Sequence, residues 1–92
     1  MRTRFECIIY GAVQGVSFRD FTRRAAQELG ITGTVENLPD GTVRVVAEGE
    51  EEGLKKLLAH LWEKHPFARV ARIDETWSAA TGVFSDFRIG PS

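Results

Sequence analysis

The sequence contains a single cysteine and no long apolar run. Cys7 has no second cysteine to pair with, so the chain cannot form an internal disulfide, and a reducing compartment is the expected setting. No stretch approaches the ~18 apolar residues of a membrane-spanning helix, and the polar residues after Met1 do not resemble the start of a signal peptide. We therefore expect a cytoplasmic protein with no membrane partner.

The chain also lacks an excess of charge of either sign. Its 12 Lys and Arg residues stand against 13 Asp and Glu residues, which gives a formal net charge of −1. This balance gives no electrostatic reason to expect a nucleic acid partner, so any anion site must be local. A length of 92 residues suits one domain, and we expect a single domain over residues 1–92 and a monomer.

Hydrophobic periodicity predicts two helices among several strands. The helices are predicted at residues 18–29 and 50–65, where apolar residues recur on one helical face. The predicted strands are 4–11, one around Val35, 43–46, 68–77 and 84–89. The order β-α-β-β-α-β with a further C-terminal strand predicts a ferredoxin-like α+β sandwich, in which both helices cover one face of an antiparallel sheet. The apolar residues of 68–77 are out of step, which indicates a bulge.

The segment 11–19, Gly-Ala-Val-Gln-Gly-Val-Ser-Phe-Arg, connects the first predicted strand to the first helix. The first amides of a helix and its dipole attract anions, and Gly11 and Gly15 permit tight turns and close approach of a ligand. Arg19 lies at the unfavourable end of the dipole unless it meets an anion, to which it adds several donors. A phosphate site fits these features, and so does an ordinary turn with a solvated Arg19.

Several other residues are assigned structural roles. Cys7 lies on the apolar side of its strand and is expected to be a buried hydrophobe. His60 and His65 lack the further ligands of a metal site, and His65 is expected to bind the last carbonyl groups of its helix.

Three further expectations concern packing and helix capping. Trp62 falls on the apolar stripe of the second helix, and Glu48 is expected on a solvated face. Ser17 followed by Asp20 predicts a side-chain cap at the start of the first helix.

Two motifs make the chain resemble the acylphosphatase family. Residues 11–19 match the signature Gly-x-Val-Gln-Gly-Val-x-Phe-Arg at each fixed position. Residues 33–37, followed by Asp-Gly at 40–41, match Gly-Trp-Val-x-Asn except at its second position. Weaker matches at 26–30 and 66–70 extend the resemblance over nearly the whole chain.

The resemblance implies an enzyme that hydrolyses acyl phosphates to a carboxylate and inorganic phosphate, without a metal or an organic cofactor. It implies that Arg19 binds the substrate phosphate and that Asn37 orients the attacking water. It also implies that the phosphate oxygens are held by the backbone amides of Gln14, Gly15, Val16, Ser17 and Phe18.

Two positions depart from the family pattern. Thr34 stands where the family usually has tryptophan, and Ala12 stands where a basic or polar residue is frequent. Neither position carries a catalytic group, so we expect changes in packing or in substrate attraction rather than loss of the chemistry.

Other functions share this fold and parts of the pattern. A non-catalytic anion-binding module would have the same ligands, and only turnover distinguishes it. The acylphosphatase-like domain of larger carbamoyl-transferring maturation factors is disfavoured by a chain that starts with Met1 and ends with the fold. An RNA-binding domain would need aromatic residues on its central strands, which 43–46 lacks, and a metal-carrying domain would need paired cysteines.

Overall fold

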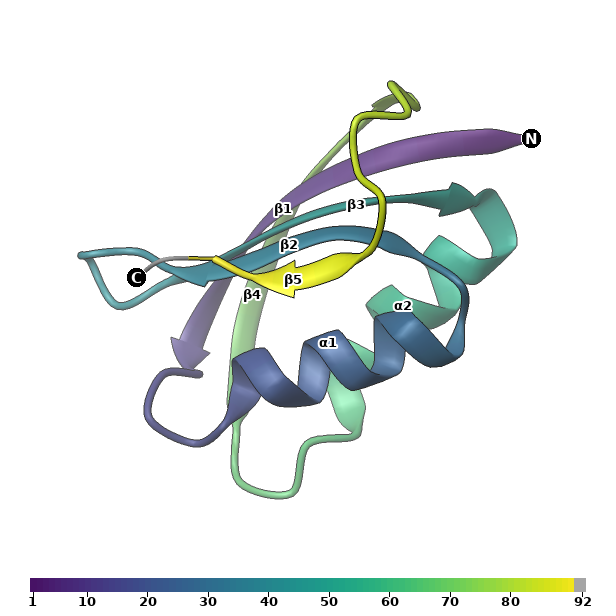
Figure 1. Cartoon of the computed structure of the whole chain (residues 1–92). Helices are drawn as coiled ribbons and strands as arrows, with labels where there is room; N and C mark the ends of the chain where they lie inside the picture. Colours follow the sequence, from purple (N-terminus) through teal and green to yellow (C-terminus); the bar gives the residue numbers. More distant parts are fainter. Residues whose placement is uncertain (91–92) are drawn as a thin grey trace.

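The computed structural model describes residues 1–90, and within them two helices lie on one face of a five-stranded sheet (Figure 1). In chain order the elements are β1 (Arg2–Ala12), α1 (Phe18–Glu28), β2 (Thr32–Asn37), β3 (Val43–Glu50), α2 (Glu51–Glu63), β4 (Arg69–Ala79) and β5 (Phe87–Ile89). This order confirms the predicted ferredoxin-like α+β class. None of the helices within the described range is long and apolar enough to cross a membrane.

The strands lie in the order β4-β1-β3-β2-β5. The first four pair antiparallel, as predicted, whereas β5 pairs parallel to β2. The sheet is therefore mixed at this edge. The reason is geometric: the chain leaves β4, crosses the sheet and returns in the opposite direction, which is the direction in which β2 already runs. The crossing occupies residues 80–86, so β5 is shorter than the predicted 84–89.

The predicted bulge lies in β4, where it pairs with β1. Tyr10 pairs with Arg72 and Gly11 pairs with Val70, which leaves Ala71 as the extra residue. A bulge bends its strand and increases the local twist. It lies where β1 is about to end, and so it affects how the chain leaves the sheet.

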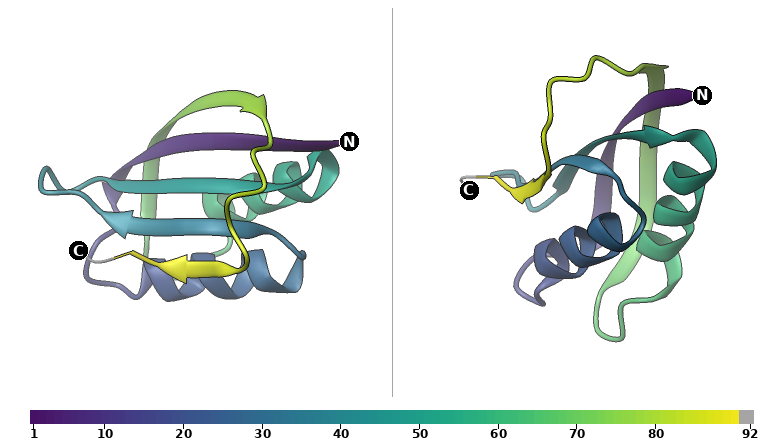
Figure 2. Two further views of the ribbon diagram at one scale, coloured as in Figure 1. Left: turned by 45° about the horizontal axis from the view of Figure 1, so that its top comes forward. Right: turned by 45° about the vertical axis from the view of Figure 1, so that its right-hand side comes forward.

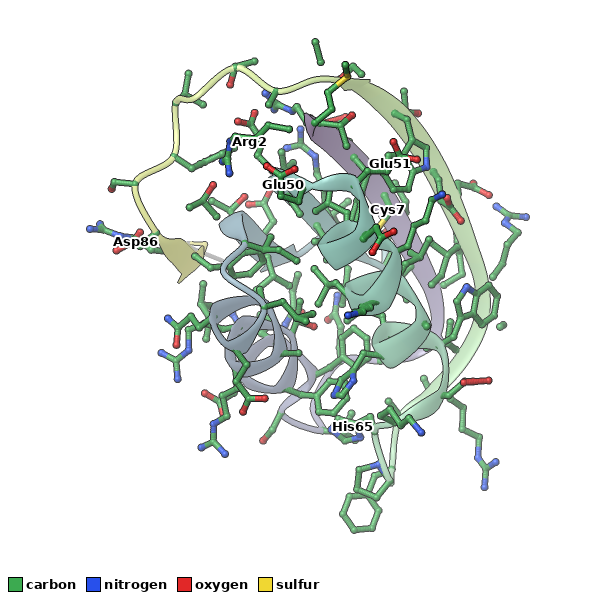
Figure 3. The ribbon with its side chains drawn as sticks, turned by 90° about the vertical axis from the view of Figure 1, so that its right-hand side faces the viewer. Arg2, Cys7, Glu50, Glu51, His65 and Asp86 are labelled. Carbon is green, nitrogen blue, oxygen red and sulfur yellow. The ribbon has the colours of Figure 1, made fainter. Side chains whose placement is uncertain are left out.

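The core lies between the sheet and the two helices. Alternate residues of β1 point into it, namely Phe5, Cys7 and Ile9, and all three are at most 1% exposed. Burial, together with the nearby Glu75 charge, raises the pKa of the Cys7 thiol to about 12, so the thiol stays neutral. This confirms the structural role predicted for Cys7, whose position relative to α2 is shown in Figure 3.

The prediction that Trp62 belongs to the core is wrong, since 43% of it is exposed. The buried stripe of α2 is formed by Leu54, Leu57 and Leu61. Trp62 follows Leu61 by one residue, a rotation of about 100° around the helix axis, which carries its side chain to the border of the stripe.

The crossing segment 80–86 passes over the face of the sheet opposite to the helices (Figure 2). It is bound there by Glu48, which is 0% exposed. The Glu48 carboxylate accepts hydrogen bonds from the backbone N–H of Thr81 (3.1 Å), the Thr81 hydroxyl (2.7 Å) and the backbone N–H of Gly82 (2.9 Å). Arg4 adds an ion pair at 3.3 Å. The expectation of a solvated Glu48 is therefore wrong, because a segment distant in sequence covers it.

These contacts keep the carboxylate charged. Burial alone would raise the pKa of Glu48, but the hydrogen bonds from Thr81 and Gly82 and the charge of Arg4 outweigh it and hold the pKa below its ordinary value of 4.5. A carboxyl group with a lowered pKa stabilises the fold above its unfolded-state pKa and stops doing so as the pH falls through its folded-state pKa.

We expect Glu48→Gln to lower the free energy of unfolding by about 1–3 kcal/mol at pH 7, because an amide accepts fewer and weaker bonds than a carboxylate. Urea denaturation measured between pH 3 and pH 7 checks this, and the difference in unfolding free energy from wild type should shrink as the pH falls below about 4.5.

Glu50→Gln is the matched control: Glu50 is an exposed residue of β3, paired with the N-terminus at 2.9 Å. We expect Glu50→Gln to change the free energy of unfolding much less than Glu48→Gln does, because an exposed ion pair contributes little. Equal losses in both variants, or a Glu48→Gln loss as large at pH 3 as at pH 7, would show that the lowered pKa of Glu48 does not stabilise the fold.

Candidate active site

The loop from β1 to α1 is sharply turned before the helix begins. Gly15 has φ 77°, and Ser17 has φ 61° and ψ 28°, which makes it the one non-glycine residue with positive φ among residues 1–90. A left-handed conformation costs an L-residue roughly 1–2 kcal/mol, and such residues cluster at functional sites. The first helical hydrogen bond runs from Phe21 N–H to the Ser17 carbonyl. The backbone amides of the residues between these two have no acceptor within the helix, and such amides are suited to an anion.

The predicted side-chain cap is not formed. The Ser17 hydroxyl makes no capping hydrogen bond, because a cap needs an extended backbone and Ser17 is left-handed. The Asp20 carboxylate instead pairs with Arg23 and, at 2.9 Å, with Arg24. These ion pairs offset the negative charge that Asp20 brings to the first turn of the helix.

The two residues expected to act on substrate lie at element ends. Arg19 is the second residue of α1 and is partly buried, directly after the turned loop. Asn37 is the last residue of β2, also partly buried, and pairs with Val43 across the hairpin. Thr34, which departs from the family pattern, lies opposite Val46 on the face of the sheet away from the helices, and its strand keeps its register as far as Asn37.

The loop and the hairpin are joined through Gln14. Its side-chain nitrogen Nε2 donates to the backbone carbonyls of Leu38 at 2.9 Å and of Thr42 at 2.8 Å. These carbonyls belong to the turn that follows Asn37. The structure therefore links the loop between β1 and α1 to the strand end that carries Asn37. Sequence reasoning considered only the backbone of Gln14 and missed this role of its side chain.

A groove of about 340 Å³ lies beside the loop, between α1 and α2. Its lining includes Ser17, Phe21, His60 and His65. The Nδ1 atom of His65, the residue labelled below α2 in Figure 3, accepts hydrogen bonds from the backbone amides of Phe67 (3.0 Å) and Ala68 (2.9 Å). The prediction that His65 binds helix carbonyls is therefore wrong. A ring nitrogen without hydrogen accepts rather than donates, and it organises the turn after α2.

No group of three or more His, Cys, Asp or Glu side chains suited to a metal ion occurs within the described part of the chain.

Comparison with known proteins identifies the family. The family model for acylphosphatases matches residues 5–89. The chain belongs to the acylphosphatase family. A protein named acylphosphatase from Frankia casuarinae is 44% identical over 85 residues, which cover 92% of this chain and 96% of the relative.

Solved structures agree with this assignment. The crystal structure of acylphosphatase from Bacillus subtilis superposes with a TM-score of 0.93 at 32% identity, covering 97% of this chain and 99% of that one. The structure of HypF from T. kodakarensis has a TM-score of 0.82 at 32% identity, but the match covers 96% of this chain and only 12% of that protein. The acylphosphatase fold thus occurs both as a whole protein and as a small part of a larger one.

Two glycines lie at the corner between β1 and the loop, and we expect their substitution by alanine to lower stability by different amounts. A Cβ on Gly11 would lie 2.0 Å from the backbone carbonyl oxygen of Arg69, at φ 135°, whereas a Cβ on Gly15 would meet nothing within 4 Å, at φ 77°. We expect Gly11→Ala to lower the free energy of unfolding by about 2–4 kcal/mol, because β1 and β4 must separate. Gly15→Ala should cost only about 1–2 kcal/mol, from backbone strain alone. Urea denaturation compares the two, and equal losses would show that close contact with β4 does not matter.

Proposed function

We propose that this protein is an acylphosphatase that hydrolyses the carboxyl-phosphate bond of acyl phosphates and releases a carboxylate and inorganic phosphate. One observation carries the proposal: the turned loop before α1, with Arg19 directly after it, is tied by Gln14 to the strand end that bears Asn37. This link supports the proposal that an anion-binding loop and a water-binding amide act together. Family membership supports the same activity.

The substrate phosphate is proposed to bind the backbone amides of Gln14 to Phe18 and the guanidinium of Arg19. A guanidinium offers several donors in a fixed plane and stays charged at all physiological pH values. Phosphoryl transfer depends largely on positioning and on stabilising the charge of the phosphoryl oxygens, and these donors provide both.

Asn37 is proposed to hold the attacking water. Its amide can orient a water through a hydrogen bond but is too weak a base to remove a proton. The water oxygen forms a bond to phosphorus while the bond from phosphorus to the acyl oxygen breaks, and the water proton passes to a phosphate oxygen. The products are a carboxylate and inorganic phosphate, so atoms and charge balance.

The leaving group explains why so few side chains suffice. A carboxylate is a weak base and departs without a proton, so the reaction needs no general acid. We propose that the donors at the loop also make a metal or an organic cofactor unnecessary. We further propose a monomer acting in the cytoplasm.

We expect Arg19→Ala and Asn37→Ala each to lower kcat/KM for benzoyl phosphate by about 10²–10³, because each removes a group aimed at the reacting atoms. Lys55→Ala is the control: Lys55 is a cationic residue of α2 whose side chain is 66% exposed and pairs with Glu51 at 3.1 Å. Its activity should stay close to wild type. Phosphate release is measured with a chelator present, and inorganic phosphate should inhibit wild type competitively but Arg19→Ala only weakly.

Near-normal turnover by folded Arg19→Ala or Asn37→Ala protein would defeat these assignments. Phosphate binding by wild type without any turnover would indicate the non-catalytic anion-binding module instead.

A further inference from the structure

We propose that the side chain of Gln14 is a positioning residue that holds Asn37 at its working distance from the phosphate loop. This inference rests on the proposed function. It adds a role for the side chain of a residue whose backbone amide alone was expected to contribute.

The contacts of Gln14 use both hydrogens of its amide group. One is donated to the Leu38 carbonyl at 2.9 Å and the other to the Thr42 carbonyl at 2.8 Å. Since both partners are acceptors, the amide nitrogen and not the amide oxygen must face them. Both bonds are partly buried, so losing them would leave carbonyl groups poorly solvated.

The turn that Gln14 binds is closed on itself. Leu38 N–H donates to the Thr42 carbonyl at 2.9 Å, and Gly41 N–H donates to the Leu38 carbonyl at 3.1 Å. Each of these two carbonyls therefore accepts one hydrogen bond from within the turn and one from Gln14. The Asp40 carboxylate adds bonds to the Thr42 amide (3.0 Å) and hydroxyl (2.6 Å), which stiffen the same turn.

Asn37 is adjacent to both anchoring points. Asn37 and Val43 form the last pair of the β2–β3 ladder. The two residues that Gln14 binds lie in the turn just beyond this pair: Leu38 follows Asn37, and Thr42 precedes Val43. The amide of Gln14 thus holds the end of the ladder from both sides. Because Gln14 itself lies in the loop, the position of Asn37 is defined relative to the loop rather than only to the rest of the sheet.

The bonds of Gln14 affect the rate of hydrolysis through the position of Asn37. A water must approach phosphorus in line with the bond that breaks, and misplacing a reacting group by about 1 Å can cost on the order of 10²-fold in rate. Phosphate binding by the loop amides and Arg19 does not require Asn37 to be in place. Loss of the Gln14 bonds should therefore lower kcat more than it weakens phosphate binding.

The first test is Gln14→Met, which has a similar length and no donors. We expect kcat for benzoyl phosphate to fall about 10–100-fold, with the inhibition constant of inorganic phosphate within about 3-fold of wild type. The matched control is Gln27→Met, which removes a bond from Gln27 Nε2 to the Phe87 carbonyl (3.3 Å) between α1 and β5. It should leave kcat unchanged. Parallel losses of kcat and of phosphate binding would overturn the inference, because Gln14 would then support the loop itself.

The second test combines variants. If Gln14 acts through Asn37, adding Gln14→Met to Asn37→Ala should lower kcat less than about 2-fold further, since interacting residues give non-additive effects. Adding Gln14→Met to Arg19→Lys should instead multiply the two losses. An equal Gln14→Met effect with and without Asn37 would overturn the inference while leaving the proposed activity intact. If wild type itself fails to turn over benzoyl phosphate, the proposed function fails as well.

A third measurement needs no variant. In wild-type protein the side-chain amide hydrogens of Gln14, followed by NMR, should exchange with solvent more slowly than those of Gln27, because two short bonds to the hairpin protect them. Equally fast exchange of the two groups would overturn the inference even if Gln14→Met does not fold.

Discussion

The candidate site depends on the backbone corner at which β1 leaves the sheet. Gly11 lies so close to the carbonyl of Arg69 that no side chain fits, and the bulge at Ala71 lies directly beside it. Beyond the corner, the left-handed Ser17 turns the chain into α1 and places Arg19 in its first turn. Within this short segment, Gln14 bonds the hairpin turn at Leu38 and Thr42, so the course of the segment also sets where the loop meets the hairpin.

Periodicity and the family motifs were enough to predict the helices, most strands, the bulge in β4 and the loop that precedes Arg19. These features are local, and their signals lie within a few residues of one another. The roles of Glu48 and Gln14 were not predictable in this way, because their partners lie 33 and 24 positions away, at Thr81 and Leu38. The missing cap at Ser17 had another cause: a local pattern suggested it, but the backbone needed by the loop overrides it.

Glu48 and Gln14 both bind segments that lack regular secondary structure. Each uses one polar side chain to hold a segment without regular secondary structure: the crossing 80–86 in one case and the hairpin turn in the other. In both cases the partners are mainly backbone groups, which every residue except proline can supply in full. These hydrogen bonds therefore depend mainly on the backbone course of the two segments.

The position of β5 has a consequence for the surface of the molecule. By pairing with β2, β5 covers one edge of the sheet for three residues, which leaves the eleven residues of β4 as the long edge. An uncovered strand offers backbone groups to any other sheet it meets. In β4 the row of unpaired backbone groups is broken by the bulge at Ala71, and the charged residues Arg72, Asp74 and Glu75 follow it. Such features discourage edge-to-edge association between copies of the sheet.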